Sequence, residues 1–270
     1  METSGSTGSP HKSLITVICE EEPTSEKDLK KIVEKAESGK WKVLDVKETA
    51  VKKAPRAPFI TSTLQQSASS RLGFSPSRTM GIAQKLYESG FITYMRTDST
   101  NLSQVAIAQI AQTVEKKYGK ENLQIRTYSA KSKNAQEAHE AIRPTHFNVE
   151  KAGHNDEQKK LYELIWRRAV SSQMKDADTL RTKITANIEG DGIPNFSANG
   201  SQVKSPGWLL ADPASKGEDV ELPKVVTGEK LDLKKVNTEQ KETLPPPRYS
   251  EAGLIKELEK RGIGRPSTYA

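Results

Sequence analysis

The sequence is poor in cysteine and has no long apolar run. Its single cysteine, Cys19, excludes a disulfide within the chain and a zinc site made of four cysteines. Because Cys19 lies in the apolar run of residues 14–19, we expect a small core residue rather than a nucleophile. No run approaches the roughly 18 apolar residues of a membrane-spanning helix, and no signal peptide is evident. We therefore expect a cytoplasmic protein without a membrane partner.

The chain is moderately basic. It has 42 Lys and Arg against 35 Asp and Glu, which gives a formal net charge of +7. This excess is compatible with a polyanionic partner such as nucleic acid, and equally with an ordinary basic soluble protein. At 270 residues the chain is long enough for about two domains with their own cores.

The N-terminal part predicts a short leader followed by half of a β-rich domain. Residues 1–12 are of low complexity, and we expect a disordered leader. Strands are expected at residues 14–19, as a buried strand, and at 41–49. Between them Ser25 is expected to cap a helix that ends at Gly39. The first half of this domain spans residues 13–57, and the basic, proline-bearing residues 52–58 form a linker.

Residues 58–176 predict a mainly helical domain. Apolar spacing of four and serine caps, such as Ser75 before Pro76, mark its helices. The expected helices cover residues 62–72, 76–90, 104–118, 136–142 and 156–174. A β-like run, residues 91–100, follows the second helix. Helix, helix and strand in this order are similar to a winged-helix arrangement.

The period of the pattern changes after residue 176. Apolar residues alternate from Leu180 to Ile188, which predicts a half-buried strand. Further strands are expected near residues 208–210 and 230–236. We expect residues 177–248 to complete the β-rich domain, so that the helical domain interrupts it. The predicted fold class is α+β.

The C-terminal residues 249–270 predict the start of a further helical domain. Ser250 is expected to cap a helix that Gly262 ends. Pro266 and Ser267 then signal another helix, but the chain stops shortly afterwards. This pattern predicts a truncated domain.

Residues 91–100, FITYMRTDST, hold the candidate nucleophile. Alternate side chains of a strand share a face, so Tyr94 and Arg96 are expected to point the same way. A cation beside a phenol favours the phenolate and neutralises charge on a phosphate, as attack on a phosphodiester requires. On composition alone, a core tyrosine beside a solvated arginine is the simpler interpretation. Asp98 either orients Arg96 or caps the following turn.

Four blocks in order resemble the type IA DNA topoisomerases. They are residues 57–66 (APFITSTLQQ), 92–103 (ITYMRTDSTNLS), 136–144 (QEAHEAIRP) and 249–268. The methionine between the tyrosine and the arginine is similar to bacterial topoisomerase I, whereas the topoisomerase III branch more often has proline there. The resemblance implies the central fragment of such an enzyme, in which an antiparallel β-rich arch carries the tyrosine-bearing, winged-helix-like domain.

The resemblance also implies a reaction. Tyr94 would attack one strand of single-stranded DNA to give a 5′-phosphotyrosyl link, and the 3′-hydroxyl would leave. The link conserves the bond energy, so relaxation of negative supercoils needs no ATP. Arg96 is the candidate clamp for the phosphate, because a guanidinium matches two phosphate oxygens at once.

Other residues are carried over from the matching blocks. His139 is implied to contact the phosphate of the bound strand. Arg143 either contacts backbone phosphate or plays a structural role beside Pro144, and we favour the structural role. The resemblance implies that DNA lies near Arg265, Ser267 and Thr268, which form a plausible phosphate site at a helix start.

The family binds Mg²⁺ through an acidic cluster, Asp-x-Asp-x-Glu, in an N-terminal Toprim domain, and it has C-terminal zinc modules. This sequence contains neither pattern. We therefore expect the Mg²⁺ ligands of the intact enzyme to lie outside this chain and the fragment itself to bind no metal. The fragment is expected to be a monomer that binds single-stranded DNA weakly without cleaving it, within a nucleoid-associated enzyme of the cytoplasm.

Two other functions remain possible at this point. A non-catalytic module that binds single-stranded nucleic acid would share the same scaffold. Tyrosine recombinases and type IB topoisomerases also use a tyrosine on DNA, but they need an Arg/Lys/His constellation and form a 3′-phosphotyrosyl link. The four blocks do not resemble theirs.

Overall fold

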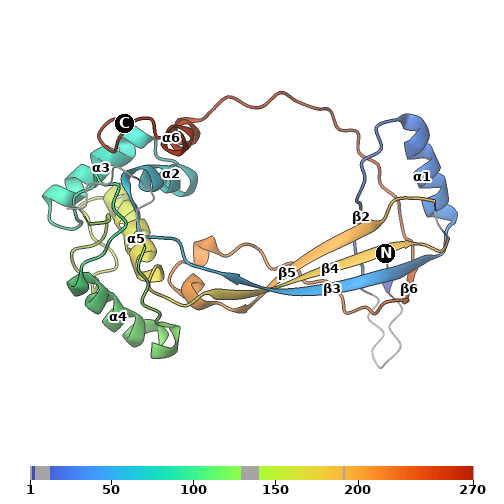
Figure 1. Cartoon of the computed structure of the whole chain (residues 1–270), viewed down its shortest axis with the longest axis horizontal. Helices are drawn as coiled ribbons and strands as arrows, with labels where there is room; N and C mark the ends of the chain where they lie inside the picture. Colours follow the sequence, from blue (N-terminus) through green and yellow to red (C-terminus); the bar gives the residue numbers. More distant parts are fainter. Residues whose placement is uncertain (1, 4–12, 129–139, 191, 270) are drawn as a thin grey trace. The chain divides into compact units, whose positions relative to one another are not determined.

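The computed structural model (Figure 1) describes residues 2–3, 13–128, 140–190 and 192–269. The chain forms two compact units. The first, the sheet unit, comprises residues 1–52, 178–205 and 217–244. The second, the helical unit, comprises residues 53–177, 206–216 and 245–270. Each unit is thus assembled from three separate stretches of the chain.

The sheet unit is built on one antiparallel sheet. Its strands in the described residues are β1 (Glu2–Thr3), β2 (Ile18–Cys19), β3 (Trp41–Lys53), β4 (Ala177–Ile188), β5 (Phe196–Ser205) and β6 (Lys230–Asp232). Their order across the sheet is β1-β6-β3-β4-β5-β2. The longest pairing joins β4 and β5, with Ala186 opposite Phe196 at one end and Asp178 opposite Ser205 at the other.

Helix α1 (Glu26–Ser38) supplies the apolar cover of this sheet. Ser25 caps it, because its hydroxyl oxygen accepts a hydrogen bond from the backbone N–H of Asp28 at 3.1 Å. Ala36 on α1 is buried with Trp41 and Ile184 of the sheet in one apolar cluster. The indole N–H of Trp41 donates to the Ala36 carbonyl at 2.8 Å. A buried Trp therefore keeps its polar atom paired while its ring stabilises the core.

The helical unit contains the other α-helices of the described chain. They are α2 (Thr61–Leu72), α3 (Pro76–Glu88), α4 (Gln104–Tyr118), α5 (Asp156–Ser171) and α6 (Glu251–Lys260). Helix α2 packs against α3, α5 and α6, and α5 also packs against α3 and α4. Fully buried side chains such as Leu64, Leu86, Ile110 and Ile165 form its core. The fold class α+β is thereby confirmed.

The serine caps predicted from the sequence are confirmed. Ser75, Ser103 and Ser250 each accept a backbone N–H from the residue three positions later. These caps depend only on neighbours in the sequence, which is why local pattern identifies them.

The expectation of a buried strand at residues 14–19 is wrong. Only Ile18 and Cys19 form a strand, at the edge of the sheet next to β5. Ile15 is buried, whereas Leu14 and Ile18 are 68% and 72% exposed. Cys19 is only partly buried, and its thiol donates to the Glu21 carbonyl at 3.1 Å, so it is no core residue. Successive side chains of a strand point to opposite faces of the sheet, so an apolar run in a strand need not be buried throughout.

The expected strand at residues 208–210 is also wrong. Gly207–Leu210 form a 3₁₀ helix of the helical unit. Gly207 adopts φ +47°, and a Cβ there would lie 2.1 Å from the Asp176 carbonyl oxygen. The indole N–H of Trp208 donates to the Lys53 carbonyl at 2.7 Å. Close backbone approach therefore fixes this segment as a tight turn. Strand β5, by contrast, had no sequence prediction.

Smaller differences concern segment ends. Glu2 and Thr3 pair with β6 where a disordered leader was expected, and residues 4–12 lie outside the described residues. Lys52 and Lys53 of the expected linker still belong to β3. Of the helix expected at 136–142, residues 136–139 lie outside the described residues. Residues 140–142 are extended, because Ile142 bridges to Phe59 instead.

Candidate functional site

The tyrosine segment, residues 91–101, lies between two other extended segments of the helical unit. On one side Ile92 bridges to Pro144. On the other side the backbone N–H of Thr61 donates to the Thr97 carbonyl at 2.9 Å. The outer segments are themselves joined, because the Ile142 N–H donates to the Phe59 carbonyl at 2.8 Å. Three of the four sequence blocks thus meet at this point.

Thr61, the first residue of α2, fixes the backbone on both sides of Arg96. Its hydroxyl donates to the carbonyl oxygens of Met95 at 2.8 Å and Thr97 at 3.1 Å. The same oxygen accepts the N–H of Thr97 at 2.9 Å. Thr61 is fully buried, so solvent does not compete for these hydrogen bonds. The backbone is therefore held in place on both sides of the residue that carries the Arg96 side chain.

Thr93 fixes the other side of Tyr94. Its hydroxyl donates to the Ala141 carbonyl at 2.7 Å and accepts the Arg143 N–H at 3.0 Å. Its own backbone N–H donates to the Arg143 carbonyl at 2.9 Å. Because Thr93 directly precedes the tyrosine, the backbone entering Tyr94 is fixed as firmly as the backbone around Arg96.

The prediction that Tyr94 and Arg96 lie on a β-strand is wrong. The segment forms a single isolated bridge, at Ile92, and no strand. Its burial nevertheless alternates: Met95 and Thr97 are almost fully buried, whereas Tyr94 and Arg96 are exposed. Hydrogen bonds from threonine side chains take the place of those of a β-sheet. Buried and exposed residues still alternate along the segment, as they would in a strand. Both candidate side chains therefore leave the core.

Tyr94 has an aromatic neighbour on α3. Its ring and that of Tyr87 stand edge to face, with centroids 5.3 Å apart and an interplanar angle of 68°. Tyr94 is 38% exposed. Edge-to-face pairs of this kind stabilise the relative orientation of two rings. The tyrosine is thus held by its ring while part of its surface stays accessible.

Asp98 shows neither of the two contacts considered from the sequence. Within the described chain, no hydrogen bond or ion pair joins it to Arg96. The following turn is shaped by other residues, because the hydroxyl oxygen of Thr97 accepts the Ser99 N–H and that of Ser99 accepts the Asn101 N–H. Asp98 instead lies near Tyr269: burial, and then the carboxylates of Glu259 and Asp98, raise the pKa of that phenol.

Arg143 is held by protein groups. Its guanidinium donates to the Glu140 carboxylate, at 2.9 Å from Nε, and to the Pro144 carbonyl at 2.9 Å. Glu140 also accepts the backbone N–H of Ser103 at 2.8 Å. Burial raises the pKa of Glu140, but hydrogen bonds with Ser103 and the adjacent Arg143 outweigh it and leave that pKa below 4.5. This geometry favours the structural role for Arg143.

The remaining candidates are His139 and the C-terminal trio. His139 lies outside the described residues. Arg265, Ser267 and Thr268 form a turn rather than a helix: the Thr268 hydroxyl oxygen accepts the Arg265 N–H at 2.9 Å, and the Thr268 N–H donates to the Arg265 carbonyl at 2.9 Å. This turn leads into Tyr269 and so approaches Asp98.

Sequence reasoning missed Thr61 and Thr93 as positioning residues. Thr61 lies inside the block APFITSTLQQ, which was used only as a mark of resemblance. Its partners are more than 30 residues away in the sequence, and no local pattern signals a hydrogen bond over that separation. The burial of Thr61 at the start of α2, where its side chain is not the cap, is seen only in the structure.

The described residues contain neither a metal-binding cluster nor a membrane-crossing helix. No group of three or more His, Cys, Asp or Glu side chains in that part of the chain fits a metal ion, so the residues present do not fit a magnesium site. No helix there has the length and apolarity needed to cross a bilayer.

Comparison with known proteins identifies the relatives. Residues 10–270 match the DNA topoisomerase family. DNA topoisomerase 1 of Escherichia coli strain K12 is 46% identical over 254 residues, which are 92% of this chain and 29% of that protein. DNA topoisomerase 1 of Salmonella typhimurium is 48% identical over 240 residues, 87% of this chain and 27% of that protein.

A solved structure agrees with the sequence matches. Full-length topoisomerase I from Thermotoga maritima aligns with a TM-score of 0.79 and 38% identity, covering 94% of this chain and 43% of that chain. The chain thus spans less than a third of the length of the curated relatives named above.

Proposed function

This chain belongs to the bacterial DNA topoisomerase family, as a fragment of a type IA topoisomerase I, and we propose that it carries the nucleophile of that enzyme. The intact enzyme would break and rejoin one DNA strand and so relax negative supercoils without ATP. The observation that supports this best is the tyrosine segment: exposed Tyr94 and Arg96 flank buried Met95, on a backbone fixed by Thr61 and Thr93.

In the proposed step the phenol oxygen of Tyr94 forms a bond to the phosphorus of one phosphodiester. The bond from phosphorus to the 3′ oxygen breaks, the phenol loses its proton, and the leaving 3′ oxygen gains one. A 5′-phosphotyrosyl link results, and the reverse step rejoins the strand. A protonated phenol is a weak nucleophile, so the step needs charge stabilisation.

Arg96 is proposed to supply part of that stabilisation. Within the described residues no hydrogen bond or ion pair engages its guanidinium, which is therefore available to a phosphate. Since Thr61 fixes the carbonyl and N–H groups on either side of Arg96, little backbone freedom is lost when the phosphate binds. His139, Arg265, Ser267 and Thr268 are proposed as contacts of the bound single strand.

Mg²⁺ would supply electrostatic stabilisation of the phosphate in the intact enzyme. The described residues do not fit such a site, so we propose that its ligands lie outside this chain. We further propose that the chain alone is a monomer that binds single-stranded DNA weakly and forms no covalent link. Within the intact enzyme it would act in the cytoplasm, on the nucleoid.

The inactivity of the chain alone is tested with a labelled single-stranded oligonucleotide and Mg²⁺. We expect no covalent adduct on a denaturing gel, with weak reversible binding by fluorescence anisotropy. A covalent adduct at Tyr94 would overturn this part of the proposal.

The enzymatic role is tested in the full-length protein with Tyr94→Phe. We expect relaxation to be abolished and DNA binding to be retained, because only the phenol oxygen is removed. Tyr87→Phe is the matched control, since it removes a neighbouring phenol oxygen and keeps the ring pair. If Tyr94→Phe relaxes DNA as well as Tyr87→Phe does, the chain is a non-catalytic binding module instead.

A further inference from the structure

The helical unit contains a pocket that the tyrosine chemistry does not use. Its volume is about 450 Å³. It lies between the residues that precede α2, one side of α2 itself, Arg168 of α5 and the first two turns of α6, and Thr100 of the tyrosine segment also borders it. The pocket therefore adjoins the candidate site without including Tyr94 or Arg96.

The side chains that line this pocket carry charge of one sign. Three are cationic, namely Arg56, Arg168 and Lys256, and among the described residues that line the pocket there is no carboxylate. The uncharged polar members are chiefly hydroxyl-bearing: Thr63, Ser67, Ser70 and Thr100. Guanidinium, ammonium and hydroxyl groups together are donors suited to an anion with several oxygen acceptors.

Arg168 is a buried cation that forms no ion pair with a carboxylate in the part of the chain that the structure describes. It is only 7% exposed, and its guanidinium makes two long hydrogen bonds, to the Ala57 carbonyl at 3.4 Å and the Ser67 hydroxyl at 3.5 Å. Its guanidinium carbon lies 4.2 Å from the centroid of the Phe59 ring. Burial of a charge costs stability unless an opposite charge compensates it.

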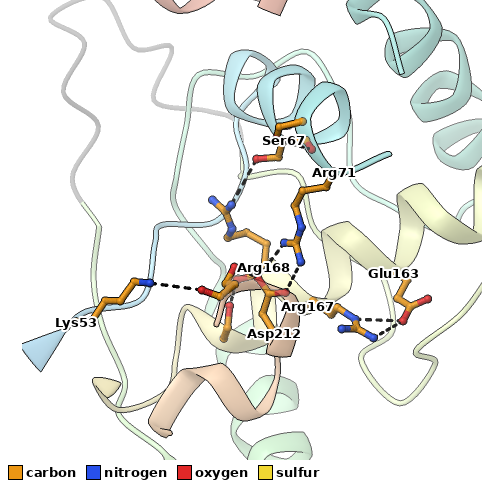
Figure 2. Close-up of polar contacts among 10 residues, drawn as sticks. Lys53, Ser67, Arg71, Glu163, Arg167, Arg168 and Asp212 are labelled. Carbon is orange, nitrogen blue, oxygen red and sulfur yellow. Dashed lines mark hydrogen bonds and ion pairs between the residues drawn. The ribbon is translucent and has the colours of Figure 1, made fainter. Parts of the chain in front are cut away.

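Asp212, the carboxylate that acts electrostatically on Arg168, is already engaged by another arginine. Figure 2 shows Arg71 directed to Asp212, whereas Arg168 is directed to Ser67. The Arg71 guanidinium donates to both carboxylate oxygens of Asp212, at 2.9 and 2.6 Å. Burial, with repulsion from Arg56 and Arg71, lowers the pKa of Arg168 to about 10, so it stays protonated at neutral pH.

Two helix starts add to the positive potential. Thr63 in the first turn of α2 and Gly253 in the first turn of α6 both border the pocket. Helix N-termini carry partial positive charge, which falls off within one turn and therefore acts mainly on groups at this distance.

We propose that this pocket binds a phosphate group, with Arg56, Arg168 and Lys256 as its cationic ligands. The phosphate belongs either to a phosphodiester of a DNA strand or to a free phosphate compound. The bound anion would neutralise the buried Arg168. The proposal goes beyond the nucleophilic role of Tyr94 and stands without it.

The test uses the chain itself and a double variant, Arg56→Gln with Lys256→Gln. Both side chains are exposed, so neither change removes a core contact. The matched control is Lys116→Gln with Lys159→Gln, which removes the same charge from exposed positions of α4 and α5 outside the pocket. Binding of inorganic pyrophosphate is measured by calorimetry, and that of a short oligothymidylate by fluorescence anisotropy.

We expect the pocket variant to weaken binding by at least about tenfold and the control by less than about twofold. Weakening for both probes, or for the oligonucleotide alone, assigns the phosphate to DNA. Weakening for pyrophosphate alone assigns it to a free compound. Equal weakening in the two double variants, or none in either, overturns the proposal. Both assays measure reversible binding by a protein that keeps Tyr94 and Arg96, so their outcome does not depend on the nucleophile assignment.

Discussion

At the scale of single residues, the position of the candidate nucleophile depends on threonines rather than on a β-ladder. Thr61 and Thr93 each hold backbone atoms of residues that adjoin Tyr94 or Arg96. The resemblance to a known family identified Tyr94 and Arg96 from the sequence. The alternation of side chains along an extended segment predicted that both would point the same way. The sequence did not identify the two threonines, because their hydrogen bonds join residues far apart in the sequence.

Thr61→Val tests this positioning. Valine has nearly the same shape but no hydroxyl, so the buried Met95 carbonyl and Thr97 N–H each lose a hydrogen-bond partner. We expect a loss of about 2 kcal/mol in the free energy of unfolding, measured with urea. Thr113→Val is the control, because the Thr113 hydroxyl bonds only to the Gln109 carbonyl within α4. A loss for Thr61→Val no larger than for Thr113→Val would contradict the account.

The Arg71–Asp212 pair predicts a second stability effect. Asp212 is 2% exposed, so Asp212→Asn leaves Arg71 without its buried partner. We expect a loss of about 3 kcal/mol at neutral pH. Glu163→Gln, which affects a more exposed pair with Arg167, should cost less than about 1 kcal/mol.

The Asp212 effect should depend on pH in a defined direction. Burial raises the pKa of Asp212, but hydrogen bonds from Arg71 and Ser215 outweigh it, and that pKa falls below its ordinary value of 3.8. A lowered folded-state pKa stabilises the protein above the unfolded value, and this stabilisation is lost as the pH falls through the folded value. The gap between wild type and Asp212→Asn should therefore be full at neutral pH and shrink below pH 3.8. A gap that does not vary with pH would contradict the ion-pair explanation.

At the scale of elements, helices were predicted better than strands. The start of a helix is determined by residues that are neighbours in the sequence, as the caps Ser75 and Ser103 illustrate. A strand is defined by partners elsewhere in the chain. Residues 14–19 look like a buried strand in isolation, yet only Ile18 and Cys19 form one, and β5 pairs on both sides without a strong pattern of its own. The turn at Gly207 depends on Asp176, which no local pattern reveals.

Ser103→Ala tests the cap of α4 directly behind the tyrosine segment. The hydroxyl that accepts the Ala106 N–H is lost, while the Ser103 backbone N–H to Glu140 remains. We expect a loss of about 1 kcal/mol in the free energy of unfolding by urea titration. Ser103→Asn should restore most of it, since asparagine is an equally good cap. If alanine and asparagine give the same stability, the cap does not contribute.

At the scale of the whole molecule, two compact units are interleaved along the chain, and the helical unit carries every described candidate site residue. The change from helical to strand-like spacing of apolar residues after residue 176 predicted two separate domains from the sequence alone. It did not reveal that residues 206–216 belong to the helical unit, because that assignment comes from contacts with distant residues such as Lys53 and Asp176. The division into an arch domain and a tyrosine-bearing domain stays a prediction.

The most direct test identifies the atom that carries DNA. The full-length protein is trapped in mid-reaction with Mg²⁺ and a single-stranded oligonucleotide, digested, and analysed by mass spectrometry. The account predicts one nucleotide-bearing peptide, residues 79–96 after cleavage at arginines or an overlapping one, with the 5′-phosphate on the oxygen of Tyr94. A nucleotide on any other side chain, or none under conditions where the protein relaxes DNA, would contradict it.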